Sequence, residues 1–360
     1  MPPKWPGDGL FKTSLRELAP SLGVLLERRP RLWFLALALA SAAIARAPEA
    51  KAGEPEPTVA EAIGLGPVSV NAPAKVASDN LVAPAPVAFG TWKGLGFGTY
   101  LAPKADFVDP DGGFDVVFHF HAGQMAERQL KDSGLNAVFV SCGFGIGSGA
   151  YASALASPER FGRMLAELVK NVESSTGKRG LHVRHLALAS WSAGFAAVSK
   201  ILGVDRYYAM VDTVILNDSL HSQYLDPNPK TPAQGADRVD PKMMRAFLRF
   251  AKDASEGKKV MVITHSAIIP PDYASSSEAT QALLSAIEVR GIAVDEAGSR
   301  DMTLTKRADA GNLHVRGFRG GGPRDHFQHL YLIGEALQSW VVPRWKPEER
   351  LVYTLAGEQL

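Results

Sequence analysis

The segment Ser190-Trp191-Ser192-Ala193-Gly194 has the residue types and spacing of a turn that presents a nucleophilic serine. Small residues stand two positions before and two positions after Ser192, which lets a strand and the following helix approach closely around a strained turn. The helix would direct its positive dipole end toward Ser192, and the Ala193 amide could donate to a developing oxyanion. This pattern predicts nucleophilic catalysis, but small residues can also simply pack a junction between a strand and a helix.

A serine nucleophile needs a general base, and two histidines near the carboxyl end could supply it. They lie in Arg324-Asp325-His326-Phe327-Gln328-His329, which follows an apolar run at 313–318 and a loop of three glycines. Alternatively, Asp325 caps the final helix with Gln328 as its partner, which would leave both histidines on the surface.

The base in turn needs an acid that holds its imidazole in the correct tautomer. Asp218 follows the apolar run at 211–216 and preserves the chain order serine, acid, histidine. Alternatively, Asp218 is a turn residue that bonds its own backbone, as the sequence Asn217-Asp218-Ser219 favours.

Short apolar runs alternate with helical patterns between these motifs, which is typical of a mostly parallel sheet with helices on both faces. The predicted strands are 99–101, 114–120, 137–142, 185–189, 211–216, 259–264 and 313–318. Helices are predicted to begin at Ser157-Pro158, at Asp240-Pro241 and at the capping box of Ser275 and Glu278. We therefore expect an α/β fold with parallel strands.

The order of these motifs resembles the α/β-hydrolase superfamily over residues 114–340. The resemblance rests on a strand that ends in His121-Ala122-Gly123-Gln124, the serine turn, an acid and a terminal histidine. Ser190 stands where the superfamily has its first turn glycine, and His-Ala replaces its His-Gly pair. The acid is common after the strand at 259–264, but here no carboxylate comes before Asp272. Asp218 occupies a position that some members use for the acid.

The resemblance implies a serine hydrolase of the carboxylesterase kind. Ser192 would be the nucleophile, His326 the favoured base with His329 as the alternate, and Asp218 the acid. Amides of Ala193 and of Gly123 or Gln124 would hold the oxyanion, and His121, Trp191 and Tyr224 would line the substrate pocket. A short cap insertion is expected at 225–239, and this mechanism requires no metal and no organic cofactor.

Three alternatives remain. His119 and His121 share a strand face and could hold a metal with Asp325, His326, His329 or His265, as in a metal-dependent hydrolase or deacetylase. The run Gly145-Ile146-Gly147-Ser148-Gly149-Ala150 matches a dinucleotide-binding pattern, but the next helix is predicted only near Ser157, so we interpret the run as a loop at the site. Finally, the chain could be a catalytically inactive, secreted binding module that keeps the hydrolase fold.

The amino-terminal region predicts export. Arginines precede an uncharged apolar segment at 32–45, which resembles a secretory signal and is shorter than the roughly 20 residues that span a bilayer. We expect a signal peptide or membrane anchor at 1–52, an Ala/Pro-rich linker at 53–88 and the hydrolase domain at 89–360. The protein would be periplasmic or secreted, in contact with a membrane only through an uncleaved amino-terminal segment.

The amino-acid composition limits which classes of molecule and ion the protein is expected to bind. The chain has 39 Lys and Arg against 37 Asp and Glu, a net charge of +2 that gives no support to nucleic-acid binding. Cys142 is the only cysteine, which excludes an intramolecular disulfide and a cluster of metal-binding thiolates. The expected partner is a small-molecule or cell-envelope ester.

Overall fold

The computed structural model describes residues 87–226 and 235–345. The predicted leader at 1–52 and nearly all of the predicted linker at 53–88 therefore lie outside the described residues, as does part of the predicted cap. Within the described ranges, no helix combines the length and the apolar character needed to cross a membrane.

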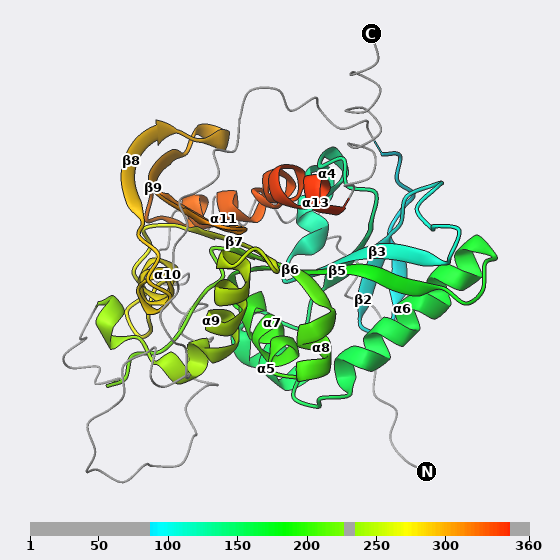
Figure 1. The fold of residues 1–360 in the computed structure, drawn as a ribbon, viewed down its shortest axis with the longest axis horizontal. Helices are drawn as coiled ribbons and strands as arrows, with labels where there is room; N and C mark the ends of the chain where they lie inside the picture. The colour runs from blue at the N-terminus through cyan, green and yellow to red at the C-terminus, as the bar shows by residue number, and fades with distance from the viewer. Residues whose placement is uncertain (1–86, 227–234, 346–360) are drawn as a thin grey trace, which may run out of the picture.

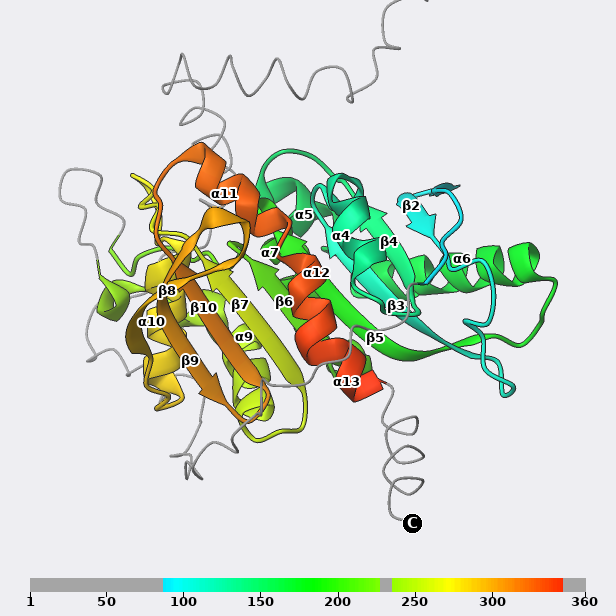
Figure 2. The same ribbon diagram turned by 90° about the horizontal axis from the view of Figure 1, so that it is seen from above.

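A mixed sheet, mostly parallel at its centre, forms the middle layer of the fold (Figures 1 and 2). The strand order is β1-β2-β4-β3-β5-β6-β7-β10-β9-β8. The strands are β1 (Lys93–Leu95), β2 (Gly98–Leu101), β3 (Gly113–Phe120), β4 (Val138–Cys142), β5 (His182–Trp191), β6 (Val211–Asn217), β7 (Val260–His265), β8 (Ile292–Ala297), β9 (Thr303–Ala310) and β10 (Leu313–Phe318). Pairing is parallel from β4 through β3, β5, β6 and β7 to β10, whereas β1, β2, β8 and β9 pair antiparallel.

Helices cover both faces of this sheet, which confirms the predicted fold class. They are α4 (Glu127–Asp132), α5 (Ser148–Ala154), α6 (Arg160–Thr176), α7 (Phe195–Leu202), α8 (Asp205–Met210), α9 (Pro241–Ser255), α10 (Ser276–Ala286), α11 (Pro323–Leu330), α12 (Ile333–Ala336) and α13 (Val342–Trp345). Figures 1 and 2 show α4 and α11 to α13 on one face and α5 to α10 on the other. Short 3-10 turns include η1 (Gly123–Ala126) and η2 (Ser192–Gly194).

The two faces bury separate apolar cores because successive side chains of a strand point to opposite sides. On β3, Phe118 and Phe120 belong to the core beneath α6, α7 and α9, whereas Val117 belongs to the core beneath α4 and α11 to α13. The last described helical run completes this second core with Leu330, Ile333, Leu337, Val341 and Trp345. The Trp345 indole donates to Asp212 at 2.7 Å, which ties this run to the start of β6.

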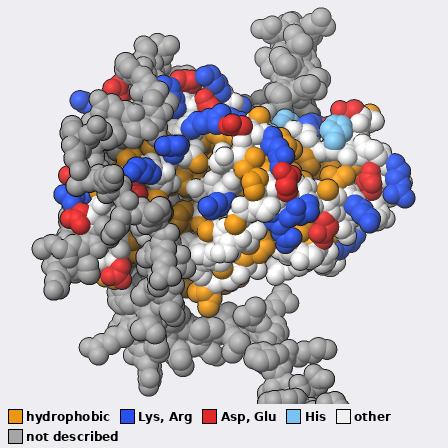
Figure 3. Space-filling view, turned by 90° about the horizontal axis from the view of Figure 1, so that it is seen from below, with side chains coloured by type: hydrophobic (Ala, Val, Ile, Leu, Met, Phe, Trp, Pro, Cys, Tyr) orange, Lys and Arg blue, Asp and Glu red, His pale blue; other side chains and the backbone are white. Residues whose placement is uncertain are grey.

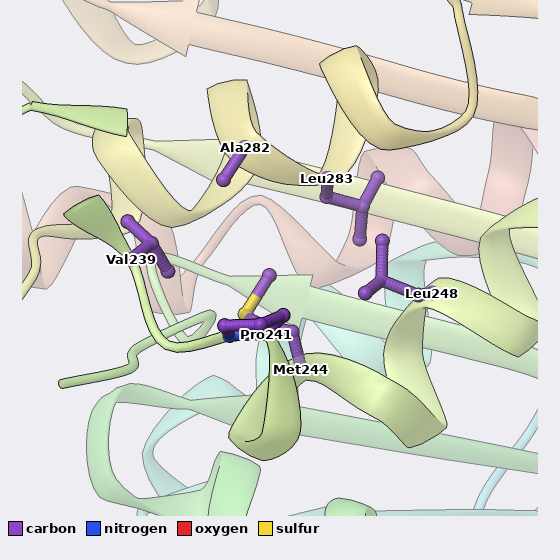
Figure 4. Close-up of a pocket in the computed structure, with 6 residues that line it drawn as sticks. All are labelled: Val239, Pro241, Met244, Leu248, Ala282 and Leu283. Atoms are coloured by element: carbon purple, nitrogen blue, oxygen red, sulfur yellow. The ribbon is translucent and has the colours of Figure 1, made fainter. Parts of the chain in front are cut away.

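Local signals explain where two of the predicted helices begin, whereas α6 begins at Arg160 and not at the predicted Ser157-Pro158. Asp240 accepts the Lys242 amide at 2.8 Å at the start of α9, with Pro241 in the first helical position. Ser275 and Glu278 form the predicted capping box of α10. Figure 4 shows Met244 and Leu248 of α9 facing Ala282 and Leu283 of α10, a small apolar pocket at the packing contact of these two helices.

Two expectations were wrong. A helix begins at Ser148 rather than near Ser157, because Gly147 is extended and the small residues that follow allow the tight turn of α5. The antiparallel strands β8 and β9 were not predicted, since β8 is largely exposed and has no apolar run.

Figure 3 shows basic and acidic side chains interspersed on the face that it presents.

Candidate active site

Strained backbone gathers where three adjacent strands end. His121 and Ala122 after β3, Ser192 after β5 and Asp218 after β6 have φ values of 74°, 58°, 51° and 46°. Residues other than glycine rarely adopt this left-handed region, and such strain collects at functional sites because the surrounding structure must enforce it. The carboxyl ends of β3, β5 and β6 thus form the candidate active site.

The turn at Ser192 is held by close packing. A Cβ atom on Gly194 would lie 2.2 Å from the carbonyl oxygen of Phe120 on β3, so this position requires glycine. Ser190 is fully buried, and its hydroxyl lies 2.8 Å from that of Ser219, which in turn donates to the carbonyl of Ser192 at 2.8 Å. A serine is therefore accommodated at position 190, and its hydroxyl links the turn to the loop after β6.

The structure brings His326 and Asp218 together across 108 residues of chain. The Nδ1 atom of His326 lies 2.7 Å from Oδ2 of Asp218, and the Ser266 amide donates to the other carboxylate oxygen at 3.0 Å. Burial raises the pKa of the Asp218 carboxyl, but the imidazoles of His329 and His326 and the Ser266 amide outweigh burial and hold the pKa well below its usual value. Because an ionised carboxylate only accepts, His326 donates from Nδ1, which leaves Nε2 as the basic atom.

The ring of Trp191 fixes the other side of His326. Its indole nitrogen donates to the carbonyl of His326 at 2.9 Å, and the two ring centroids are 4.6 Å apart. The N-cap of α11 is Gly322, whose amide donates to Asp325 at 2.9 Å. The alternative in which Asp325 is the cap and both histidines are on the surface is wrong, because both are buried.

His329 occupies a different environment from His326. It has no exposed surface, and its Nδ1 lies 2.7 Å from the hydroxyl of Thr264 at the end of β7. Burial lowers the pKa of His329 to about 4. Of the two candidate bases, His326 is therefore the one that contacts the acid directly.

His121 and Trp191, two of the three expected pocket residues, lie against each other. Their rings stack with centroids 5.2 Å apart, and Nδ1 of His121 is hydrogen-bonded to the hydroxyl of Tyr151 at 2.8 Å. Tyr151 belongs to α5 and was missed, since nothing in its sequence surroundings links it to His121. The third expected pocket residue, Tyr224, instead donates its hydroxyl to Glu278 at the start of α10.

The expected oxyanion donors lie in the two short 3-10 turns that follow β5 and β3. Ala193 follows Ser192 in η2, and Gly123 and Gln124 begin η1, where amides have no acceptor within the helix. The Gln124 amide donates to the hydroxyl of Ser141 at 3.1 Å. A Cβ atom on Gly123 would lie 2.8 Å from that same hydroxyl, so the turn packs tightly against β4.

The residues of the metal alternative do not converge. Among the described residues, no group of three His, Cys, Asp or Glu side chains could hold a metal ion. His119 is buried, and burial lowers the pKa of its imidazole to about 3. His265 bonds its Nδ1 to the carbonyl of Ser266, and Asp325 is engaged in the first turn of α11.

These elements form an α/β fold with a mostly parallel central sheet, in which a serine lies on a strained strand-to-helix turn and the chain order is serine, acid and histidine. No protein-family model and no curated protein matches the sequence. Among solved structures, it is similar to a cold-adapted esterase from an Arctic intertidal metagenomic library, with 11% identity, a TM-score of 0.37 and coverage of 68% of this chain and 87% of that one.

Two further solved structures have a comparable similarity. S-formylglutathione hydrolase from Staphylococcus aureus has 11% identity and a TM-score of 0.37, over 71% of this chain and 98% of that one. Glucuronoyl esterase from Solibacter usitatus has 10% identity and a TM-score of 0.36, over 77% and 91%.

Proposed function

We propose that the protein is a serine hydrolase that cleaves a carboxylic ester, thioester or amide through an acyl-enzyme. The observation that carries the proposal is the hydrogen bond of 2.7 Å between His326 and an ionised, buried Asp218, at the same sheet edge as the strained Ser192. A dyad of this kind orients an imidazole for proton transfer, and a strained serine turn exposes a hydroxyl.

In the proposed reaction, the Ser192 oxygen attacks the carbonyl carbon of the substrate while Nε2 of His326 takes the hydroxyl proton. Asp218 stabilises the imidazolium that forms. Amides of Ala193 and Gly123 donate to the oxyanion; the Gln124 amide already donates to Ser141. The carbon–oxygen bond to the alcohol then breaks, and the alcohol leaves with the proton held by His326. Water activated by His326 releases the acid and regenerates Ser192.

The experiment is covalent labelling with a fluorophosphonate, because attack of an activated serine on phosphorus mimics acylation. We expect mass spectrometry to locate the label on Ser192, and ester turnover to continue in a chelator. Ser192→Ala should abolish both labelling and turnover, whereas Ser199→Ala, a half-buried serine of α7, serves as the matched control and should keep both.

The two histidines provide a second readout. His326→Ala should lower kcat by several orders of magnitude, and His329→Ala should lower it far less. If a chelator stops turnover and the fluorophosphonate never labels the protein, the reaction follows a metal-dependent mechanism instead. A folded protein with neither labelling nor turnover would favour the inactive binding module.

A further inference from the structure

Three exposed apolar side chains lie in the segments that follow β3, β4 and β7, on either side of β5 in the strand order. Met125 in η1, Ile146 in the loop after β4 and Ile269 in the loop after β7 are 49%, 76% and 57% exposed. A single exposed apolar side chain needs no explanation, but a group of them around a site indicates binding. We call these three residues the apolar rim.

Each residue of the apolar rim is close in sequence to a group that contacts the site. Met125 follows Gln124, whose amide is bonded to Ser141, and shares η1 with Gly123. Ile146 follows Gly145, whose backbone interacts with the imidazole of His121.

The third residue is anchored on the opposite side of Ser192. The loop of Ile269 begins at Ser266, which bonds Asp218, and continues with Ala267, whose amide donates to the carbonyl of Gly320 at 2.9 Å. The sheet order β4-β3-β5-β6-β7 places the strands of Met125 and Ile146 on one side of β5 and the strand of Ile269 on the other. The apolar rim therefore flanks the strand that carries Ser192.

The segments that carry the apolar rim, α5 included, contain no Asp, Glu, Lys or Arg. These segments are residues 121–126, 143–158 and 266–271, in a chain of which 21% of the residues are charged. A charged substrate group placed over these segments would lose hydration without gaining a partner from them. An apolar group would lose only unfavourable contact with water.

We propose that the substrate is an uncharged ester whose apolar chain lies over Met125, Ile146 and Ile269. This inference rests on the proposed hydrolase function and adds the class of substrate to it. The rim then contributes binding in proportion to the apolar surface that the chain covers, while the reacting carbonyl stays at Ser192.

The test is a series of p-nitrophenyl esters from acetate to octanoate, together with the monoester of succinate. Each methylene buried on the rim should raise kcat/KM by about fourfold until the rim is covered. Ile146→Ser and Ile269→Ser should each lower kcat/KM for octanoate by about fivefold or more, since each removes most of an apolar contact. The acyl group of acetate has only a methyl group to place on the rim, so its kcat/KM should stay within about twofold in these variants.

Ile292→Ser is the matched control, because Ile292 is 52% exposed on β8, at the outer edge of the sheet. It should leave the whole series unchanged. Equal kcat/KM for acetate and octanoate, a preference for the succinate monoester, or equal losses in the Ile292 and Ile146 variants would overturn the inference while acetate hydrolysis and labelling of Ser192 persist. Loss of the proposed function itself would instead appear as no labelling and no acetate hydrolysis.

Discussion

Replacing Ser192 by glycine should produce an inactive protein that is more stable than the equally inactive alanine variant. Ser192 has a φ of 51°, where a residue with a Cβ atom costs about 1–2 kcal/mol and glycine costs little. Glycine also gains about 0.4–1 kcal/mol of freedom in the unfolded chain, which opposes this relief. The net expectation is that Ser192→Gly exceeds Ser192→Ala by about 0.5–1 kcal/mol in free energy of unfolding.

Urea unfolding followed by circular dichroism measures this difference, and the same substitutions at Ser199 supply the control. Ser199 lies within α7, where Ser199→Gly should be less stable than Ser199→Ala by about 0.5–1 kcal/mol, the reverse order. If glycine is also the less stable variant at position 192, the backbone there is not strained, and the reasoning from strain to function fails.

Two further predictions concern acid stability and the support of His121. Burial lowers the pKa of His119 to about 3 and that of His329 to about 4, so the unfolded chain binds more protons below about pH 6.5. The stability that each neutral imidazole contributes is therefore complete above about pH 6.5 and falls by about 1.4 kcal/mol per pH unit toward pH 4. Urea unfolding between pH 7 and 5 should show the summed slope of the buried histidines, to which His121 and His221 also contribute because burial lowers their pKa to about 4. His119→Leu should reduce this slope by about 1.4 kcal/mol per pH unit, and an unchanged slope would contradict a neutral, buried His119. Tyr151→Phe removes the hydroxyl bonded to His121 and should lower kcat about fivefold with little change in KM, as expected when one hydrogen bond of a positioning residue is lost; a change in KM alone would instead indicate substrate contact.

The central strands were predictable because parallel strands are buried on both faces and read as continuous apolar runs. The hairpin of β8 and β9 gave no such signal, since β8 is largely exposed, β9 is mostly half-buried, and the two strands include Glu296, Lys306 and Arg307. Sequence order was enough to bring together Asp218 and His326, the pair that the structure shows in contact. The sequence favoured His326 but kept His329 as the alternate, because which histidine reaches Asp218 depends on how α11 is rotated against β7.

Other contacts of the site depend on tertiary packing, and no sequence pattern indicates them. Tyr151 reaches His121 only because α5 packs beside the end of β3, and α5 itself is built from small residues with little helical pattern. Tyr224 was expected in the pocket because it follows β6, but the start of α10 presents Glu278, which holds its hydroxyl. The position of a residue just after a strand therefore did not determine which way its side chain points.

The second core, beneath α4 and α11 to α13, is completed late during synthesis of the chain. The residues of this core include Phe89, near the start of the described residues, and Trp345, at their end. One face of the sheet is therefore covered only after α11 to α13 have been added. During translation, the growing chain can assemble the core around α6, α7 and α9 while the opposite face, with Val117 and Ile215, still lacks its cover. A nascent chain that stalls before α11 exposes this apolar face, and α11 to α13 cover it only after they have been synthesised.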